Sequence, residues 1–234
     1  MFPEESAGGG CRDVTLKGAR TPAVPRPESK GPRVELASVA DLPTSHGVFR
    51  IHVFTDGATG AEHVALVSGE VFGQERVATR IHSECLTGDA FGSLRCDCRE
   101  QLDRGLARIA ARPCGVLLYM RQEGRGIGLA NKIRAYRLQQ ERGLDTVEAN
   151  LALGLPDDCR DYAFAASMLR ELGVRSVALM TNNPDKIAQL GHAGMPVATR
   201  IPHVVAPGPL NHAYLETKAR RSGHLLYPNR TSAA

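Results

Sequence analysis

The hydrophobic pattern of this chain changes its period close to residue 100, and this change limits its possible folds more than any other feature. Before that point, short runs alternate apolar with polar side chains, as half-buried strands do. These runs are V-E-L-A-S-V from residue 34, G-V-F-R-I-H-V-F from 47, H-V-A-L-V from 63 and V-A-T-R-I-H from 77. After it, Leu102, Leu106 and Ile109 recur at helical spacing. The sequence therefore predicts a mixed α/β (α+β) fold with a β-rich first half.

The second half is expected to alternate helices and strands. The run C-G-V-L-L-Y-M is typical of a buried strand, and Leu129, Ile133 and Tyr136 after it share one helical face. A further helix is expected behind an N-cap at Asp161, followed by the strand S-V-A-L-M-T. Pro184 is expected to open the next helix.

The 234 residues have room for one ordinary domain with tails. Residues 1–32 carry three successive glycines and five prolines with almost no aliphatic periodicity, which is the composition of a flexible tail. Residues 33–228 are expected to form a single folded domain, and residues 229–234 a short C-terminal tail.

Charge and hydropathy exclude several classes of function. No apolar run approaches the roughly 20 residues that cross a bilayer, so no contact with a membrane is expected. The net charge is only +4 and Lys and Arg are scattered, which does not favour binding to nucleic acid. The amino terminus M-F-P-E-E-S does not resemble a signal peptide, so a reducing, cytoplasmic location is expected.

Three cysteines, Cys85, Cys96 and Cys98, have a spacing that suits a metal ion. Thiolates bind zinc strongly, and three of them leave the fourth tetrahedral position open for water, as in catalytic zinc sites. The alternative is that three unrelated thiols lie near one another in sequence by chance. The other cysteines, at 11, 114 and 159, are interpreted as incidental thiols.

Polar residues surround the cysteine pattern. His82 and Glu84 precede the first cysteine and are positioned to orient a bound water or move a proton. Arg80 and Arg95 add positive charge that would stabilise thiolates and attract an anion. A structural histidine and solvated arginines are the alternatives.

Two segments are candidates for phosphate binding. R-Q-E-G-R-G-I-G-L-A-N-K-I-R runs from a strand end through a glycine turn into a helix, where free backbone N–H groups and the helix dipole favour an anion. It is neither a Walker A motif nor a dinucleotide fingerprint, and a flexible loop is the alternative. In T-N-N-P-D-K, Thr181 ends a strand and Lys186 lies in the first helical turn, although Asn182 and Asn183 suit a simple turn equally well.

Taken together, these motifs resemble the GTP cyclohydrolase II family of riboflavin biosynthesis, from about residue 34 to about residue 226. The resemblance rests on R-I-H-S-E-C-L-T-G-D-A, R-C-D-C-R-E-Q-L, R-Q-E-G-R-G-I-G-L, N-K-I-R-A-Y, D-T-V-E-A-N, T-N-N-P-D-K and T-K-A-x-x-S-G-H-L-L. It makes residues 33–228 a GTP cyclohydrolase II-like catalytic domain.

The resemblance also implies roles for single residues. Cys85, Cys96 and Cys98 match zinc ligands. Asp158 matches the proposed proton acceptor, Arg160 the proposed nucleophile, and Tyr136 a tyrosine that governs removal of a formyl group. The residues that match GTP contacts are Arg80, Ile81, His82, Ser83, Glu84, Gln101, Glu123, Gly124, Arg125, Thr146, Thr181 and Lys186.

The implied reaction is zinc-dependent hydrolysis of GTP that opens the guanine imidazole ring. Formate and pyrophosphate leave, and the product is 2,5-diamino-6-ribosylamino-4(3H)-pyrimidinone 5′-phosphate, in the first step of riboflavin biosynthesis. One Zn²⁺ per chain, Mg²⁺ on the triphosphate and a homodimer are implied as well. The alternatives are an enzyme that retains the formyl group, a paralogue in specialised metabolism, and a non-catalytic zinc protein that binds a nucleotide and regulates.

Three residues keep alternative interpretations. Tyr136 shares a helical face with two apolar residues and would look the same in a core. Asp158 and its neighbour Asp157 both suit a helix cap. Arg160 carries a guanidinium with a pKa above about 12, which suits an electrostatic clamp better than a covalent nucleophile.

Overall fold

The structure is a computed structural model that describes residues 33–208, 210–221 and 223–226. The predicted tails at 1–32 and 229–234 lie outside the described residues. The described part contains a mixed sheet of seven strands in the order β1-β2-β3-β5-β4-β6-β7. The strands are β1 Val34–Thr44, β2 Gly47–Asp56, β3 Glu62–Ser68, β4 Val77–Ser83, β5 Gly115–Met120, β6 Val177–Met180 and β7 Val197–Ile201.

Strand direction changes in the middle of the sheet. Across the sheet, β1, β2, β3 and β5 each pair antiparallel with the next strand of that series. The neighbours β5, β4, β6 and β7 each pair parallel with the next. The antiparallel part comes from the alternating runs in the first half of the chain, joined by short turns. The parallel part requires crossover connections, which the helices of the second half supply. The predicted α/β fold with a β-rich first half is confirmed.

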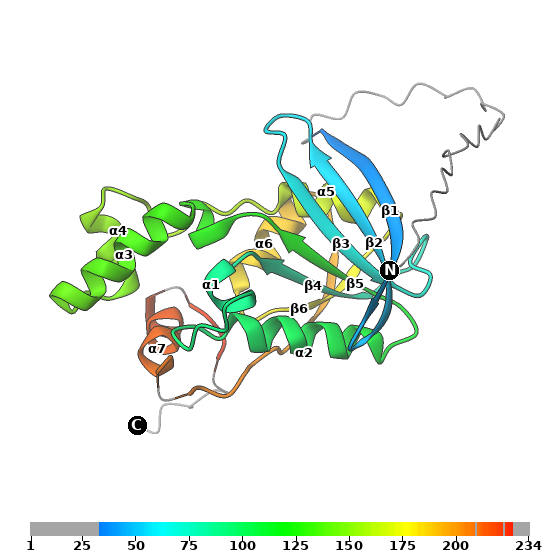
Figure 1. The fold of residues 1–234 in the computed structure, drawn as a ribbon. Helices are drawn as coiled ribbons and strands as arrows, with labels where there is room; N and C mark the ends of the chain where they lie inside the picture. The colour runs from blue at the N-terminus through cyan, green and yellow to red at the C-terminus, as the bar shows by residue number, and fades with distance from the viewer. Residues whose placement is uncertain (1–32, 209, 222, 227–234) are drawn as a thin grey trace, which may run out of the picture. The chain divides into compact units, whose positions relative to one another are not determined.

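Helices cover both faces of the sheet (Figure 1). Helix α2 packs on one face, where Ile109 lies in a core with Leu117 and Met180. Helices α5 and α6 pack on the other face, where Met168 and Leu190 belong to the larger core. The helices are α1 Leu86–Asp89, α2 Cys98–Ala110, α3 Leu129–Arg142, α4 Thr146–Ala152, α5 Ala163–Glu171, α6 Pro184–His192 and α7 His212–Arg221, with the 3-10 turn η1 Glu123–Gly126.

The alternation within β4 decides which side chains reach the candidate site. Successive side chains of a strand point to opposite faces. Val77 and Ile81 belong to the core under α5 and α6, whereas Ala78 belongs to the core under α2. Arg80 and His82 have the same parity as Ala78 and therefore point toward the face that α2 covers.

Helix α3 does not bury the apolar face that its sequence suggests. Leu129 is 38% and Ile133 46% exposed, while Lys132 and Ala135 are buried. Helix α3 packs mainly against α4 and η1 and lies with α4 to one side of the sheet (Figure 1). It has no sheet to cover, so the expected apolar stripe remains at the surface.

The helix caps differ in detail from the sequence analysis. Tyr162, not Asp161, is the N-cap of α5, although Asp161 Oδ1 accepts a hydrogen bond from Ala163 N at 2.8 Å. Pro184 opens α6 as predicted, behind an N-cap at Asn183. Helix α4 begins with a reciprocal capping box between Asp145 and Glu148, which the sequence analysis did not identify.

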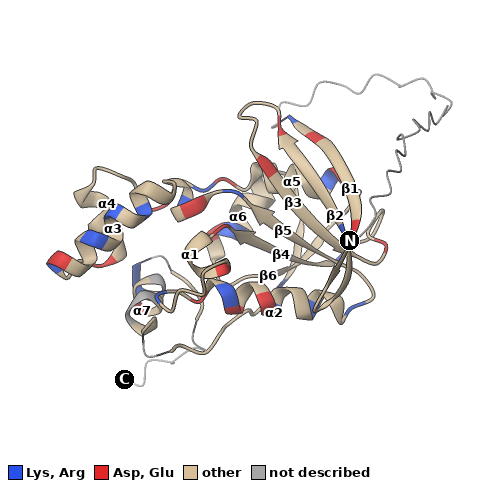
Figure 2. Cartoon of the chain, in the orientation of Figure 1, with Lys and Arg blue, Asp and Glu red and all other residues tan. Residues whose placement is uncertain are grey.

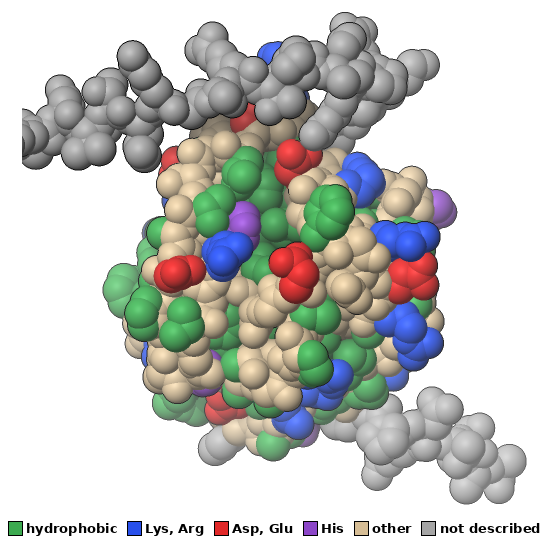
Figure 3. Space-filling view, turned by 90° about the vertical axis from the view of Figure 1, so that its right-hand side faces the viewer, with side chains coloured by type: hydrophobic (Ala, Val, Ile, Leu, Met, Phe, Trp, Pro, Cys, Tyr) green, Lys and Arg blue, Asp and Glu red, His purple; other side chains and the backbone are tan. Residues whose placement is uncertain are grey.

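Charges of both signs are interspersed along the described elements (Figure 2). On the face shown in Figure 3, hydrophobic, basic and acidic side chains are mixed, and no single sign of charge dominates that view. No helix among the described residues is long and apolar enough to span a membrane.

Candidate active site

The candidate site lies at the carboxyl ends of the parallel strands β4, β5 and β6, where ligands of such sheets collect. Cys85 follows β4, Glu123 follows β5 and Thr181 follows β6. With side chains from α2, α3 and α7, they line a cavity of about 730 Å³. A cavity of this size suits a small organic ligand.

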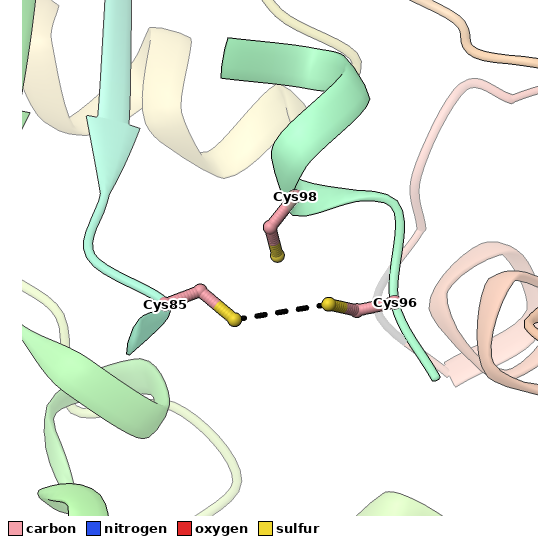
Figure 4. Close-up of side chains that lie close together, drawn as sticks. All are labelled: Cys85, Cys96 and Cys98. Carbon is pink, nitrogen blue, oxygen red and sulfur yellow. Dashed lines mark hydrogen bonds between the residues drawn. The ribbon is translucent and has the colours of Figure 1, made fainter. Parts of the chain in front are cut away.

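The three predicted cysteines converge in this cavity. Their sulfur atoms all lie within 4.8 Å of one another, and Cys85 Sγ is 3.8 Å from Cys96 Sγ (Figure 4). Three thiolates on one zinc ion at about 2.3 Å would lie about 3.8 Å apart in tetrahedral geometry. In the described part of the chain, no other His, Cys, Asp or Glu side chains form a comparable cluster. The donor set therefore fits zinc.

Gly88 in α1 leaves the space into which the sulfurs converge. A Cβ at this position would lie 2.7 Å from Cys96 Sγ, 2.9 Å from Cys98 Cβ and 3.1 Å from Cys85 Sγ. Only glycine fits without a shift of the cluster. The cysteine motif thus includes the glycine in C-L-T-G-D, which the spacing of the cysteines alone does not identify.

A buried lysine links the cluster to the loop after β5. Lys132 Nζ donates to Cys85 Sγ at 3.1 Å and to Glu123 Oε1 at 2.8 Å. Burial alone would lower the pKa of Lys132, but its two anionic partners raise it. Hydrogen bonds from Cys96 and Cys98, with Lys132 as a further contribution, lower the pKa of Cys85. The site thus favours the thiolate of Cys85, whereas the hydrogen bond with Cys85 raises the pKa of Cys96.

The buried carboxylate of Asp89 accepts several hydrogen bonds beside the cavity. Asp89 accepts hydrogen bonds from His82 Nε2 at 3.0 Å, from the Tyr119 hydroxyl at 2.9 Å and from Cys85 N at 3.0 Å. His82 and Tyr119 are paired in the β4–β5 register, and their rings stack at 5.5 Å. The bond to Asp89 places the proton of a neutral imidazole on Nε2 and leaves Nδ1 as an acceptor. Burial lowers the pKa of His82, so its imidazole is neutral at neutral pH.

Arg80 and Lys186 are two buried cations that line the same cavity. Arg80 Nη1 donates to Met180 O at 2.9 Å and Nη2 to Gln101 Oε1, while Gln101 donates to Asp97. Burial lowers the pKa of Arg80 to about 10, which leaves it charged at neutral pH. Lys186 Nζ donates to the Ile81 carbonyl at 2.9 Å.

The two adjacent aspartates of the loop before α5 pair with different arginines. Asp157 Oδ1 accepts from Arg125 Nη1 at 2.7 Å, whereas Asp158 accepts from Arg160 Nε at 2.9 Å and from Nη2. Burial alone would raise the pKa of Asp158, but the hydrogen bonds from Arg160 lower it. Neither aspartate caps α5, because Asp161 contacts its first amide instead.

Tyr136 lies at the cavity and not in a core. The Arg95 guanidinium stacks over its ring at 4.6 Å, and Lys132 Nζ is 5.8 Å from the ring centroid. Burial raises the pKa of its hydroxyl, which stays protonated at neutral pH. The alternative of a core tyrosine is therefore wrong, because the apolar neighbours on the same face are exposed.

Most residues expected to contact a substrate line this cavity. Ile81 does not, since its side chain is fully buried and only its carbonyl meets Lys186. Asp158 is not a lining residue either and reaches the cavity through its pair with Arg160. The expected residues that do line it are Arg80, His82, Ser83, Glu84, Cys85, Cys96, Cys98, Gln101, Glu123, Gly124, Arg125, Tyr136, Thr146, Arg160, Thr181 and Lys186.

Several site residues were not identified from the sequence. Asp89 and Asp97 act through other side chains, and their motifs give no signal of such contacts. Thr217 and His224 reach the cavity from the end of the described chain. Only the motif T-K-A-x-x-S-G-H marked their segment, without a role for either residue.

Comparison with known proteins identifies the family. The model of the GTP cyclohydrolase II family matches residues 35–202, which contain the whole cysteine cluster and most of the cavity. The chain belongs to the GTP cyclohydrolase II family. The resemblance found in the sequence is thereby confirmed, as is the prediction, at the level of the family, of an enzyme of the GTP cyclohydrolase II type.

Relatives with the GTP cyclohydrolase II name are similar over most of this chain. A GTP cyclohydrolase-2 of Tolumonas auensis is 55% identical over 194 residues, which cover 83% of this chain and 98% of the relative. One of Azotobacter vinelandii is 55% identical over 193 residues, 82% of this chain and 92% of the relative. The riboflavin biosynthesis protein RibBA of Bacillus subtilis is 54% identical over 187 residues, 80% of this chain and 47% of the relative. The chain thus spans about half the length of RibBA relatives and nearly all of the others.

Proposed function

We propose that this protein hydrolyses GTP with one Zn²⁺ per chain and opens the imidazole ring of guanine. Formate and pyrophosphate are released, and the product is 2,5-diamino-6-ribosylamino-4(3H)-pyrimidinone 5′-phosphate, at the first step of riboflavin biosynthesis. The observation that carries the proposal is the convergence of three thiols and several buried cations in one cavity of about 730 Å³.

Cys85, Cys96 and Cys98 would hold the zinc ion. When bound, zinc with an open position supplies a Lewis acid and lowers the pKa of water to about 7. Lys132 offsets part of the negative charge of three thiolates, and Gly88 keeps the space between them open. These residues fix the end of the cavity at which the guanine ring would be opened.

Cationic side chains of the same cavity would bind the triphosphate. Arg80 and Lys186 are nearly fully buried, and Arg125 and Arg160 also line the cavity. Buried cations lose less of their attraction for phosphate to solvent than exposed ones. Mg²⁺ is expected to accompany the triphosphate and shield its charge.

Two side chains are suited to move or hold protons. His82 Nδ1 has no hydrogen-bond partner within the described residues, and a neutral imidazole can accept a proton there. The Tyr136 hydroxyl, protonated at neutral pH, can donate a hydrogen bond to an oxygen on the substrate. Asp158 remains the family-based candidate for proton acceptor, although its carboxylate already holds Arg160.

Arg160 is proposed as an electrostatic clamp and not as a covalent nucleophile. Its guanidinium is paired with the Asp158 carboxylate, which favours the charged form. A charged guanidinium has no lone pair for attack on phosphorus but stabilises charge that develops on phosphoryl oxygens.

A homodimer in the cytoplasm completes the proposal. The homodimer rests on the family resemblance alone. The location rests on the requirement for reduced thiols at the cysteine cluster.

The decisive experiment incubates the purified protein with GTP and Mg²⁺, with and without a zinc chelator. Product mass, pyrophosphate and formate are measured on the same samples. We expect all three products without chelator and none with it. Ring opening and pyrophosphate without formate would favour the enzyme that retains the formyl group. GTP binding without any product would favour the non-catalytic regulator.

A further inference from the structure

Arg95 connects the cysteine loop to helix α3. It lies in the loop between α1 and α2, directly before Cys96. Its guanidinium carbon is 4.6 Å from the centroid of the Tyr136 ring, and Nη2 donates to Gln139 Oε1 at 3.1 Å. Tyr136 and Gln139 are three residues apart and share one face of the helix. One side chain therefore makes two contacts with α3.

The contact extends to helix α4 through Gln139. Gln139 Nε2 donates to Thr146 Oγ1 at 3.5 Å, and Thr146 is the first residue of α4 and lines the cavity. Arg95 is thus linked through Gln139 to Thr146, which lines the cavity from α4.

Tyr136 also lies close to Thr87 in α1. Burial raises the pKa of the Tyr136 hydroxyl, and the nearby Thr87 side chain offsets part of this effect; Thr87 Oγ1 lies 3.7 Å from Cys85 Sγ. Arg95, directly before Cys96, and Thr87, two residues after Cys85, therefore both act on the same tyrosine. Any change in the order of the cysteine loop would reach α3 through these contacts.

The packing of α3 makes these contacts important. Leu129 and Ile133 are exposed, and the helix packs mainly against α4 and η1 and not against the sheet. An element with few buried apolar contacts opens locally at low free-energy cost. Polar contacts such as those of Arg95 then contribute a large share of the protection of α3 against local opening.

We propose that Arg95 is a positioning residue that couples the metal-loaded cysteine cluster to helices α3 and α4. By holding the Tyr136 ring and Gln139, it keeps Tyr136 and Thr146 at the cavity when the cysteine loop is ordered. Only the kinetic consequence rests on the proposed function. The structural coupling does not require GTP turnover.

Hydrogen exchange of the full-length, zinc-loaded protein tests this coupling. We expect Arg95→Gln to speed amide exchange in residues 129–152 about fivefold, the effect of losing one partly buried cation–π contact. Arg95→Lys keeps a cation near the ring and should restore part of the protection. Arg137→Gln is the matched control, because Arg137 is on the same helix and pairs with Glu141 at the surface.

The outcomes separate this proposal from the proposed function. Wild-type protein should also exchange faster at 129–152 when zinc is removed by a chelator, and Arg95→Gln should show little further change. In kinetics, Arg95→Gln should lower kcat for GTP about tenfold at saturating zinc, more than Arg137→Gln does. Unchanged exchange in zinc-loaded Arg95→Gln would overturn the coupling even if GTP is hydrolysed. Faster exchange in a protein that does not hydrolyse GTP would leave the coupling intact and reject the proposed function.

Discussion

Lys132 Nζ lies 3.1 Å from Cys85 Sγ and 2.8 Å from Glu123 Oε1, so one buried ammonium joins the cysteine cluster to the loop after β5. Glu123 in turn accepts a hydrogen bond from Leu86 N at 2.7 Å. The cluster is therefore fixed by its own loop and also by a polar bridge to a neighbouring loop.

Replacing Lys132 by methionine should destabilise the fold. The change leaves Glu123 buried without its cation, and breaking a buried pair costs about 3 kcal/mol or more. Urea unfolding of zinc-loaded protein measures the loss. Arg137→Gln removes a surface pair and should change the free energy of unfolding by less than about 1 kcal/mol. Equal stability of the two variants would show that the bridge contributes nothing.

Replacing Gly88 by alanine should reduce zinc binding. The added Cβ would lie 2.7 Å from Cys96 Sγ and force the sulfurs apart. We expect zinc affinity, measured by competition with a chromophoric chelator, to fall at least about tenfold, as for changes around metal ligands. Gly191→Ala is the control, because a Cβ there meets nothing within 4 Å. Wild-type affinity in Gly88→Ala would contradict the steric role of this glycine.

The β-strands of the first half were predictable because each buries one face and therefore alternates. Arg80 and His82 were recognised as candidates because they lie just before Cys85 in the sequence. The sequence placed Leu129 and Ile133 on one helical face, but both are exposed on α3, because periodicity identifies a helical face and not whether anything covers it. Only the fold shows that α3 lies to the side of the sheet.

Site residues that occur together in short sequence motifs were predictable. Residues whose role depends on contacts with side chains from other elements were not. The cysteine spacing suited a metal ion, and the structure brings the three thiols together. Asp89 gave no signal, since its role arises from three donors that lie on β4, β5 and the start of α1. The pairing of Asp157 with Arg125 and of Asp158 with Arg160 was likewise undecidable, because adjacent aspartates look alike in sequence.

Arg160→Lys should retain pyrophosphate release within about tenfold of wild type, whereas Arg160→Ala should lose about 1000-fold, because charge stabilisation is the proposed role. Pyrophosphate is measured by a coupled enzymatic assay at saturating GTP. Covalent catalysis by this arginine predicts instead that the lysine and alanine variants are equally inactive.

His203 should make the protein less stable in acid. It is fully buried, its Nε2 donates to the Gln101 carbonyl at 2.9 Å, and burial, with Arg80 nearby, lowers its pKa from 6.5 to about 3. The unfolded chain therefore binds this proton more readily than the folded protein does. The contribution of neutral His203 to the free energy of unfolding is complete above about pH 6.5 and is lost as pH falls toward 3. Between these values the slope is at most about 1.4 kcal/mol per pH unit.

The variant His203→Gln can keep the hydrogen bond to Gln101 but does not titrate. Urea unfolding from pH 7.5 to 4.5 should therefore show a shallower loss of stability than in wild type. Near pH 5 the slopes of unfolding free energy against pH should differ by up to about 1.4 kcal/mol per pH unit, which corresponds to one proton. Parallel curves for the two proteins would mean that His203 is not a neutral, buried group in the folded state.

Zinc dependence of the reaction is tested by a zinc titration of chelator-stripped protein, with formate release from GTP measured at each step. We expect activity to rise linearly and saturate at one zinc per chain, and Cys85→Ser to abolish both the tight binding and the activity. Full formate release from protein that elemental analysis shows to be metal-free would contradict the proposed zinc dependence.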